Sequence, residues 1–309
     1  MAFSDPTAAY TASDLAAMID EKWSSMVLEP KFAKAVASNF FTNLSEFVSE
    51  SGDTVHIPDI FTNTFTASTQ TTQGNAVVDQ SPAQVDNTLL INTHKYVAWI
   101  IGDKDMKQLV KSYNLNEKYM TEAKNVLITA LEASLFGLWS SLSTNTVGDT
   151  ATVLSDAEIL QAIQKLDTLN YDVLTQGAFF FHPFVYWRQV VTISKYYTWN
   201  TSQLPIIRDG VFGKMDASRG LRGQVYGIPI YVSTNVVSGL STYRNILAVP
   251  EAFGYAVQTQ QNGGLIRSQV AYLLQNLGTL AVCDLIYGVA ALREAAACLI
   301  NANDTAITS

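Results

Sequence analysis

The sequence predicts an α+β fold, and three observations support this prediction. First, one amphipathic helix is predicted from Asn114 to about Leu142, because apolar residues recur there every three or four positions. Second, the segments after this helix mix strands and helices without the regular βαβ rhythm of a parallel sheet. Third, a long polar stretch precedes the helix and carries too few large apolar residues for a core of its own.

Short elements are predicted on either side of a polar excursion near the start of the chain. Two separated amphipathic helices are expected at 14–23 and 31–41, which suit an arm that packs on something else. A strand is predicted at 54–58, and a return strand rich in β-formers at 88–102. Of the 33 residues from 61 to 93, eighteen are Ser, Thr, Asn or Gln. A lone hairpin is marginal in water, so the excursion either lies on another surface or is a disordered loop.

The long helix follows this excursion. Asn114 is expected to cap its first turn, with Glu117 three residues later in capping-box position. No proline interrupts the run, so at about 1.5 Å per residue it extends for roughly 40 Å. Charged residues, Glu132 among them, fall largely off the apolar stripe and are expected on the solvent side. Gly137 costs about 1 kcal/mol relative to alanine, and close packing against a neighbouring backbone is one explanation for it.

The second half of the chain has shorter elements with clear local signals. Ser155 is expected to cap a helix that carries a clean apolar stripe, and His182-Pro183 begins a helix after a buried strand. Pro250 is expected to begin a short helix. The predicted strands are 177–181, 228–233, 245–249, 267–277 and 287–300.

The composition limits the possible functions. Only 15% of the 309 residues are charged, against about 25% in typical soluble domains, so the surface must rely on uncharged polar residues or be covered by partners. The net charge of −8 argues against electrostatic binding of nucleic acid. Cys283 and Cys298 are expected as buried small hydrophobes in a reducing compartment. The first residues do not resemble a signal peptide and no apolar run is long enough for a bilayer, so we expect a soluble protein made inside the cell.

No constellation of residues predicts an enzyme. His56, His94 and His182 are far apart in sequence, no metal-ligand spacing occurs, and nucleotide-binding and nucleophile motifs are missing. We therefore predict no catalytic, cofactor or metal site. One alternative from another class remains, a hydrolase that uses His182 with Asp284 or a nearby serine.

The order of these segments resembles the major capsid proteins of tailed bacteriophages, whose fold is shared by encapsulin shells. The resemblance covers essentially the whole chain. It is carried by the excursion, the long helix and four later segments: FFFHPFVYWRQV, GQVYGIPIYVS, NILAVPEAFGYAVQ and DLIYGVAALREAAACLI. It implies an N-terminal arm at 1–51, a two-stranded E-loop at 52–102, a P-domain at 103–175 with the spine helix at 114–142, an A-domain at 176–264, and return strands with a C-terminal tail at 265–309.

The resemblance also implies a function. It implies a structural subunit that self-assembles through hexamers and pentamers into an icosahedral shell around double-stranded DNA, which it holds without sequence-specific binding. A separate scaffolding protein, a portal and possibly a decoration protein are implied as partners, with assembly in the host cytoplasm and a final place in the virion. An encapsulin-like protein compartment is the alternative within the same fold.

Contacts between subunits are the expected sites. Residues 35 to 94 contain six acids and no Lys or Arg, whereas 95 to 124 contain six lysines, so we expect the acidic excursion to lie partly over the lysines of a neighbour. The absence of Lys and Arg between Lys34 and Lys95 makes an E-loop isopeptide cross-link, which some family members form, unexpected. The resemblance also suggests Gly137 as a hinge of the spine helix during shell expansion. The candidate contact residues are Phe61, Phe65, Asp79, Asp86, Arg208, Arg219 and Arg222.

Overall fold

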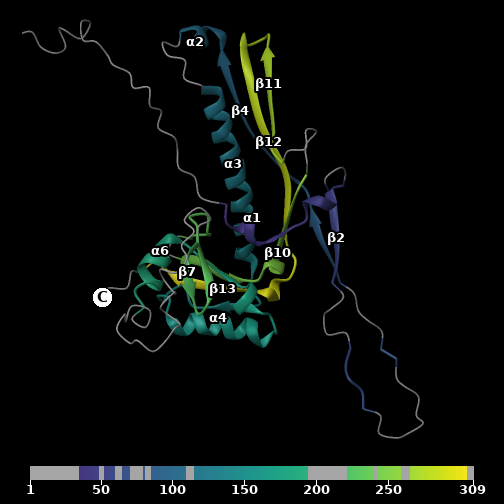
Figure 1. The fold of residues 1–309 in the computed structure, drawn as a ribbon, viewed down its shortest axis with the longest axis vertical. Helices are drawn as coiled ribbons and strands as arrows, with labels where there is room; N and C mark the ends of the chain where they lie inside the picture. Colours follow the sequence, from purple (N-terminus) through teal and green to yellow (C-terminus); the bar gives the residue numbers. More distant parts are fainter. Residues whose placement is uncertain are drawn as a thin grey trace, which may run out of the picture.

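The structure is a computed structural model of the 309-residue chain. It describes residues 35–48, 52–59, 65–69, 79–80, 85–108, 115–193, 221–239, 242–258 and 265–304. These residues form a six-stranded sheet, a five-stranded sheet and a separate two-stranded hairpin. Figure 1 shows one long helix, α3, running beside the strands that project away from the six-stranded sheet.

The six-stranded sheet is a mixed sheet with a fully buried centre. Its order is β5-β13-β9-β6-β8-β7, with β6 parallel to β8 and antiparallel to β9. Every residue of β6 is buried, which fits the continuous apolar run of its sequence. The strands are β5 (Thr146–Val147), β6 (Ala178–Phe181), β7 (Leu221–Val225), β8 (Ile228–Val232), β9 (Thr242–Ala248) and β13 (Ala297–Asn303).

Helices and turns surround this sheet. The predicted cap of α4 (Asp156–Thr168) is confirmed, because Ser155 and Glu158 form a reciprocal capping box. The buried side chains of α4 pack against β6 and β13 in one apolar cluster. The other elements here are α5 (Val173–Gln176), α6 (Pro183–Val185) and a single π-helical turn, η3 (Tyr186–Val190).

The five-stranded sheet is built on the 14-residue strand β12 (Gly278–Ala291). One side of β12 pairs along its length with β4 (Thr93–Gly102), and its other side pairs first with β11 (Arg267–Leu273) and then with β10 (Phe253–Val257). The short strand β1 (Thr42–Asn43) continues the sheet parallel to β10. Figure 1 shows β4, β12 and β11 as a narrow ribbon, which we call the three-stranded ribbon.

The long helix α3 (Leu115–Gly137) packs on one face of this ribbon. It continues as a short 3-10 turn, η2 (Leu138–Ser141), so the helix predicted at 114–142 is confirmed from 115 to 141; Asn114, its expected cap, lies outside the described residues. Alternate residues of β12 face α3 and are buried: Ala281, Cys283, Leu285 and Tyr287. Near the C-terminal end of α3, Phe136 and Trp139 meet Phe180 of the other sheet, which joins the two sheets in one core.

The hairpin consists of β2 (Thr54–Asp59) and β3 (Val85–Leu90), paired antiparallel from Thr54↔Leu90 to Asp59↔Val85. Its inner face, with Val55 and the fully buried Leu89, packs with Val48 and Ala256. The β3 backbone lies directly on β12 at Gly288, where a Cβ atom would come within 2.2 Å of the carbonyl oxygen of Leu90. The base of the hairpin is therefore fixed to the five-stranded sheet.

The segment before the hairpin is anchored in the core. It contains α1 (Ala37–Phe40), β1 and the 3-10 turn η1 (Ser45–Val48). Phe41 stacks on Phe180 and meets Phe253 edge-on, so this part of the predicted arm belongs to the main core. The helix predicted at 14–23 lies outside the described residues; of the one predicted at 31–41, only 37–40 is described as α-helix.

Four predictions about elements were wrong or incomplete. The return strand predicted at 88–102 is two strands, β3 and β4, which are separated by residues 91 and 92. The Ile91 N–H there donates to the backbone oxygen of Asp53. After this interruption β4 leaves the hairpin and pairs with β12. The hairpin within 52–102 is therefore confined to β2 and β3 in the described residues. The short helix predicted from Pro250 is a three-residue 3-10 turn, after which the fully buried β10 pairs with β12. The strand predicted at 287–300 belongs to two strands: β12 begins at 278 and ends at 291, and the 3-10 turn η5 (Glu294–Ala296) separates it from β13.

Candidate subunit-contact surfaces

The predicted contact residues of the excursion are exposed where they are described. Phe65 is 68% exposed, an unusual exposure for a phenylalanine, and Asp79 is also exposed. Asp86, on the outer face of β3, pairs with His56 of β2, with the His56 Nδ1 2.7 Å from Oδ2 of Asp86. Phe61 lies outside the described residues. These positions suit contact with another subunit, which stays a prediction.

Of the three predicted arginines, only Arg222 is described; Arg208 and Arg219 lie outside the described residues. Arg222 lies on β7, the edge strand of the six-stranded sheet, and its backbone oxygen accepts a hydrogen bond from the Tyr186 hydroxyl. Burial raises the pKa of that hydroxyl, and the positive charge of Arg222 partly offsets the effect. A contact between Arg222 and another subunit stays a prediction.

Gly137 is the last residue of α3 and lies where the α-helix changes to the 3-10 turn η2. It is exposed, its backbone is helical (φ −60°, ψ −32°), and a Cβ atom there would meet nothing within 4 Å. Close packing within the subunit therefore does not explain the glycine. The hinge stays a prediction.

His182 and Asp284, which the alternative hydrolase hypothesis paired, lie in different parts of the fold and have other partners. His182 is the N-cap of α6: its Nδ1 accepts a hydrogen bond from the Phe184 N–H, its ring stacks on Tyr243, and burial lowers its pKa. Asp284 lies on β12 in the other sheet and is held by His94 and Arg267 instead. Among the described residues no three metal-ligating side chains gather, and no helix is long and apolar enough to cross a membrane.

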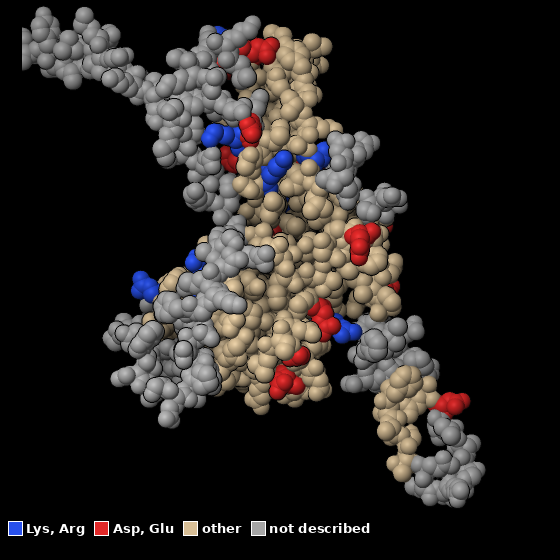
Figure 2. All heavy atoms as spheres, viewed as in Figure 1, with Lys and Arg blue, Asp and Glu red and all other residues tan. Residues whose placement is uncertain are grey.

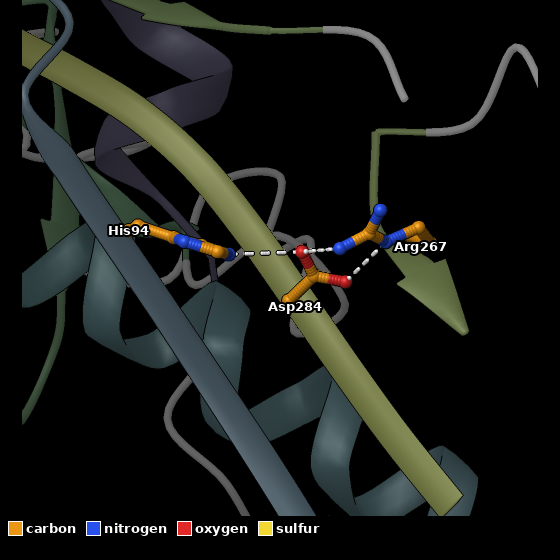
Figure 3. Close-up of polar contacts among 3 residues, drawn as sticks. All are labelled: His94, Arg267 and Asp284. Carbon is orange, nitrogen blue, oxygen red and sulfur yellow. Dashed lines mark hydrogen bonds and ion pairs between the residues drawn. The ribbon is translucent and has the colours of Figure 1, made fainter. Parts of the chain in front are cut away.

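Asp284 ties together the three strands of the ribbon. Its side chain is only 3% exposed, accepts two 2.8 Å hydrogen bonds from the Arg267 guanidinium on β11 and lies 2.9 Å from Nε2 of His94 on β4. Figure 3 shows the carboxylate between the side chains of Arg267 and His94. Burial alone raises the pKa of this carboxyl, but the hydrogen bonds and charges of Arg267 and His94 outweigh burial and hold the pKa below its ordinary value. The cluster fixes the base of the ribbon.

The rest of the ribbon exposes apolar side chains. Figure 2 shows few charged side chains over the described surface, in agreement with the low charge of the chain. The large apolar residues of the ribbon and the turn at its tip that are exposed are Tyr96, Ile100, Val270, Tyr272, Leu274 and Leu277. Tyr96 and Ile100 lie on the face of the ribbon that carries Asp284, whereas Val270 and Tyr272 lie on the face that carries Ala281, so apolar side chains are exposed on both faces. The ribbon is therefore a second candidate contact surface beside the excursion.

A buried carboxylate anchors the arm to α3. Glu132 is 1% exposed, and its two oxygens accept hydrogen bonds from the backbone N–H groups of Val36, Ala37 and Ser38 at 3.1, 2.9 and 2.7 Å. The free N–H groups at the start of α1 are thereby satisfied. The expectation that Glu132 faces solvent was wrong. Its position directly after Leu131, at the border of the apolar stripe, was the one available signal.

The chain is similar to known proteins in fold but matches none of them by sequence comparison. No family model matches the chain, and no curated protein matches its sequence. In contrast, a chain of Mycobacterium phage Che8 superposes with a TM-score of 0.67 at 18% identity, over 91% of this chain and 96% of that one. The capsid structure of Cyanophage P-SCSP1u matches with a TM-score of 0.68 at 14% identity, over 97% and 98% of the two chains. This chain has the fold of tailed-phage capsid proteins.

The same capsid fold is found in an encapsulin. The holo-SrpI encapsulin complex from Synechococcus elongatus PCC 7942 matches with a TM-score of 0.61 at 11% identity, over 97% of this chain and 98% of that one. The predicted α+β class and the resemblance to the capsid fold are thus confirmed. Each of these matches covers at least 91% of this chain and at least 96% of the other chain, so the similarity is not limited to one part of the fold.

Proposed function

We propose that this chain is the major capsid protein of a tailed bacteriophage, a structural subunit that self-assembles into a closed icosahedral shell around double-stranded DNA. The observation that carries the proposal is the full-length match to phage capsids such as that of Ralstonia phage GP4, over 100% of this chain and 99% of that one. In such a shell, hexamers and pentamers form through head-to-tail contacts that close by rotation. The chain then acts as a building unit and not as an enzyme.

The surface of the subunit supports this role. The excursion and the ribbon expose Phe65, Tyr96, Ile100 and Leu274, residues that a stable monomer would bury. Both are nevertheless firmly anchored, the hairpin base by Leu89 and Gly288 and the ribbon by the Asp284 cluster. An anchored base with exposed apolar residues suits contacts between copies that are covered only in the assembled shell.

Partners and location rest on the resemblance. A separate scaffolding protein, a portal and possibly a decoration protein would accompany assembly in the host cytoplasm, and the shell would become part of the virion. The DNA would be held without sequence-specific binding, since the net charge of the chain is −8.

Size-exclusion chromatography with light scattering tests the proposal. The purified chain, alone or with its scaffolding protein, should elute in the void volume as closed particles visible by electron microscopy. A hydrolase would elute as a monomer or small oligomer, and that result under all assembly conditions would contradict the proposal.

The encapsulin match supports a protein compartment as the second candidate. Particles from infected cells that protect double-stranded DNA from nuclease favour the phage shell, whereas particles that enclose protein favour the compartment.

Charge supports one contact within the shell. We propose that Asp79 and Asp86 of one subunit lie near lysines between Lys95 and Lys124 of a neighbour, although Asp86 already pairs with His56 of its own chain. Exposed pairs contribute only about 0.2–1 kcal/mol each and are screened by salt, so the effect concerns assembly rate. Asp79→Lys with Asp86→Lys should slow assembly at low salt and less so at high salt, with His56→Gln as the control for the internal pair. Parent-like assembly of the double variant at low salt would contradict this pairing.

A further inference from the structure

Strand β11 is an edge strand without the usual protection. It pairs with β12 on one side, and no strand among the described residues pairs with its other side. Five consecutive residues from Ser268 to Tyr272 are exposed, including Val270 at 54% and Tyr272 at 50%. Helix α3 packs on β12 and β4, and the Tyr272 hydroxyl of β11 donates a 2.9 Å hydrogen bond to Asp103 at the start of α2 (Asp103–Gln108). About half of the N–H and C=O groups of an edge strand point outward, unpaired.

Natural edge strands are protected by proline, by charges, by bulges or by a covering element. The sequence of β11, RSQVAYL, contains no proline and a single charge, Arg267. That charge is already held by Asp284 within the subunit, and β11 pairs with β12 in a regular register without a bulge. In contrast, β4, on the opposite side of β12, carries Lys95, whose charge protects that edge against pairing with another strand. Of the two edges of the ribbon, β11 therefore carries no charge that is not already paired within the subunit.

The sequence of β11 also suits pairing with itself. In an antiparallel pair of two full-length β11 strands, Val270 lies at the centre and faces Val270 of the second copy. Ser268 then faces Tyr272, Gln269 faces Ala271 and Arg267 faces Leu273, so no like charges meet. A strand edge accepts one partner strand only, so the contact joins two copies, as at a two-fold axis between capsomers.

We propose that β11 pairs antiparallel with β11 of a second copy of this chain, in register about Val270, which joins two five-stranded sheets across a two-fold contact. This inference rests on the proposed function, because the shell brings the copies together. Val270 lies on the axis of the contact, while Leu274 and Leu277 extend the exposed apolar surface beyond the strand.

A cysteine at the centre of the contact tests the register. In an antiparallel pair, directly opposed Cα atoms are about 4.5–5.5 Å apart, which permits a disulfide. Val270→Cys should therefore give covalent dimers on mild oxidation of assembled particles, read on a non-reducing gel. Ala271→Cys is the matched control, because it lies on the next, equally exposed residue and its two copies would be roughly 8 Å apart, beyond disulfide reach. The native thiols of Cys283 and Cys298 are buried with raised pKa values, that of Cys298 to about 11, and should not react.

The outcomes separate the inference from the proposed function. Selective dimers from Val270→Cys support the pairing. Particles that form but yield no dimer, or equal dimers from both variants, overturn it and leave the capsid function standing. A parent chain that never forms particles contradicts the capsid function, and selective dimers in that case still support the strand pair.

As a second measurement, Val270→Lys and Val270→Glu should each lower particle yield by roughly fivefold or more, and an equal mixture of the two variants should restore the yield. Parent-like yield from either variant alone overturns the inference.

Discussion

The buried carboxylate of Glu132 on α3 accepts a 2.9 Å hydrogen bond from the backbone N–H of Ala37, 95 positions earlier in the chain. Together with the bonds from Val36 and Ser38, this contact fixes the point at which the arm joins the body of the subunit. Tyr255 strengthens the same junction, because its hydroxyl donates to the Ser38 carbonyl at 2.8 Å. A carboxylate can accept all three N–H groups, as carboxylates do at helix N-termini.

Glu132→Gln should destabilise the unassembled subunit by about 2–3 kcal/mol, because the amide has one acceptor oxygen and turns an NH₂ group toward N–H donors. Denaturant unfolding monitored by circular dichroism measures the change. Glu122→Gln is the control, as Glu122 is a partly exposed residue of the same helix. Equal stability of the two variants would contradict the anchoring role of Glu132.

Asp284→Asn should destabilise the subunit by about 2–3 kcal/mol at pH 7, since Arg267 and His94 lose their charged partner. The sign of the pH dependence follows from the pKa of Asp284, which lies below its ordinary value in the folded state. The ionised carboxylate therefore stabilises the fold above about pH 4, and this contribution is lost as the pH falls through the folded-state pKa. Unfolding curves from pH 7 to pH 3 should show the gap between parent and variant shrinking below about pH 4. A gap that widens on acidification would contradict this account.

Gly137→Ala should stabilise the unassembled subunit by up to about 1 kcal/mol, because the position is helical, exposed and open to a Cβ atom. If Gly137 is a hinge, the variant should also alter the rate at which immature shells expand, followed by light scattering. Ala133→Gly, at an exposed position one turn earlier, tests helix propensity without changing residue 137. Unchanged expansion kinetics in Gly137→Ala would count against the hinge.

Shortening the excursion tests its role in assembly. Replacement of residues 60–84 by an Asn-Gly turn joins Asp59 to Val85, which are the last paired residues of the hairpin. The variant should keep the helix content and melting temperature of the unassembled parent, because the buried part of the hairpin is retained. It should fail to close shells, since a contact repeated over the lattice is removed. An unfolded variant, or one that still forms complete particles on electron micrographs, would refute this role.

The elements that were predictable from sequence are those set by local patterns. Helix α3 follows from its apolar repeat, and the start of α4 follows from Ser155 and Glu158, three positions apart. The division between β3 and β4 was not predictable, because it depends on pairing of β4 with β12, as in the contact of His94 with Asp284, 190 positions away. Glu132 was missed because its partners are backbone N–H groups, which no sequence pattern marks.

The candidate site was only partly predictable for a different reason. Phe65 and Asp79 were expected to be exposed because the excursion lacks a core of its own, and they are exposed. Their proposed contacts are with other copies of the chain, and neither the sequence nor one subunit identifies such a partner.

Electron cryomicroscopy of particles assembled from this chain tests the central claim most directly. The account predicts closed icosahedral shells in which this chain forms hexamers and pentamers, the excursion of each subunit lies over a neighbour, and β11 meets β11 at two-fold contacts. A preparation that yields only discrete small oligomers in the presence of its scaffolding protein, with Phe65 and Val270 still exposed to solvent, would contradict it.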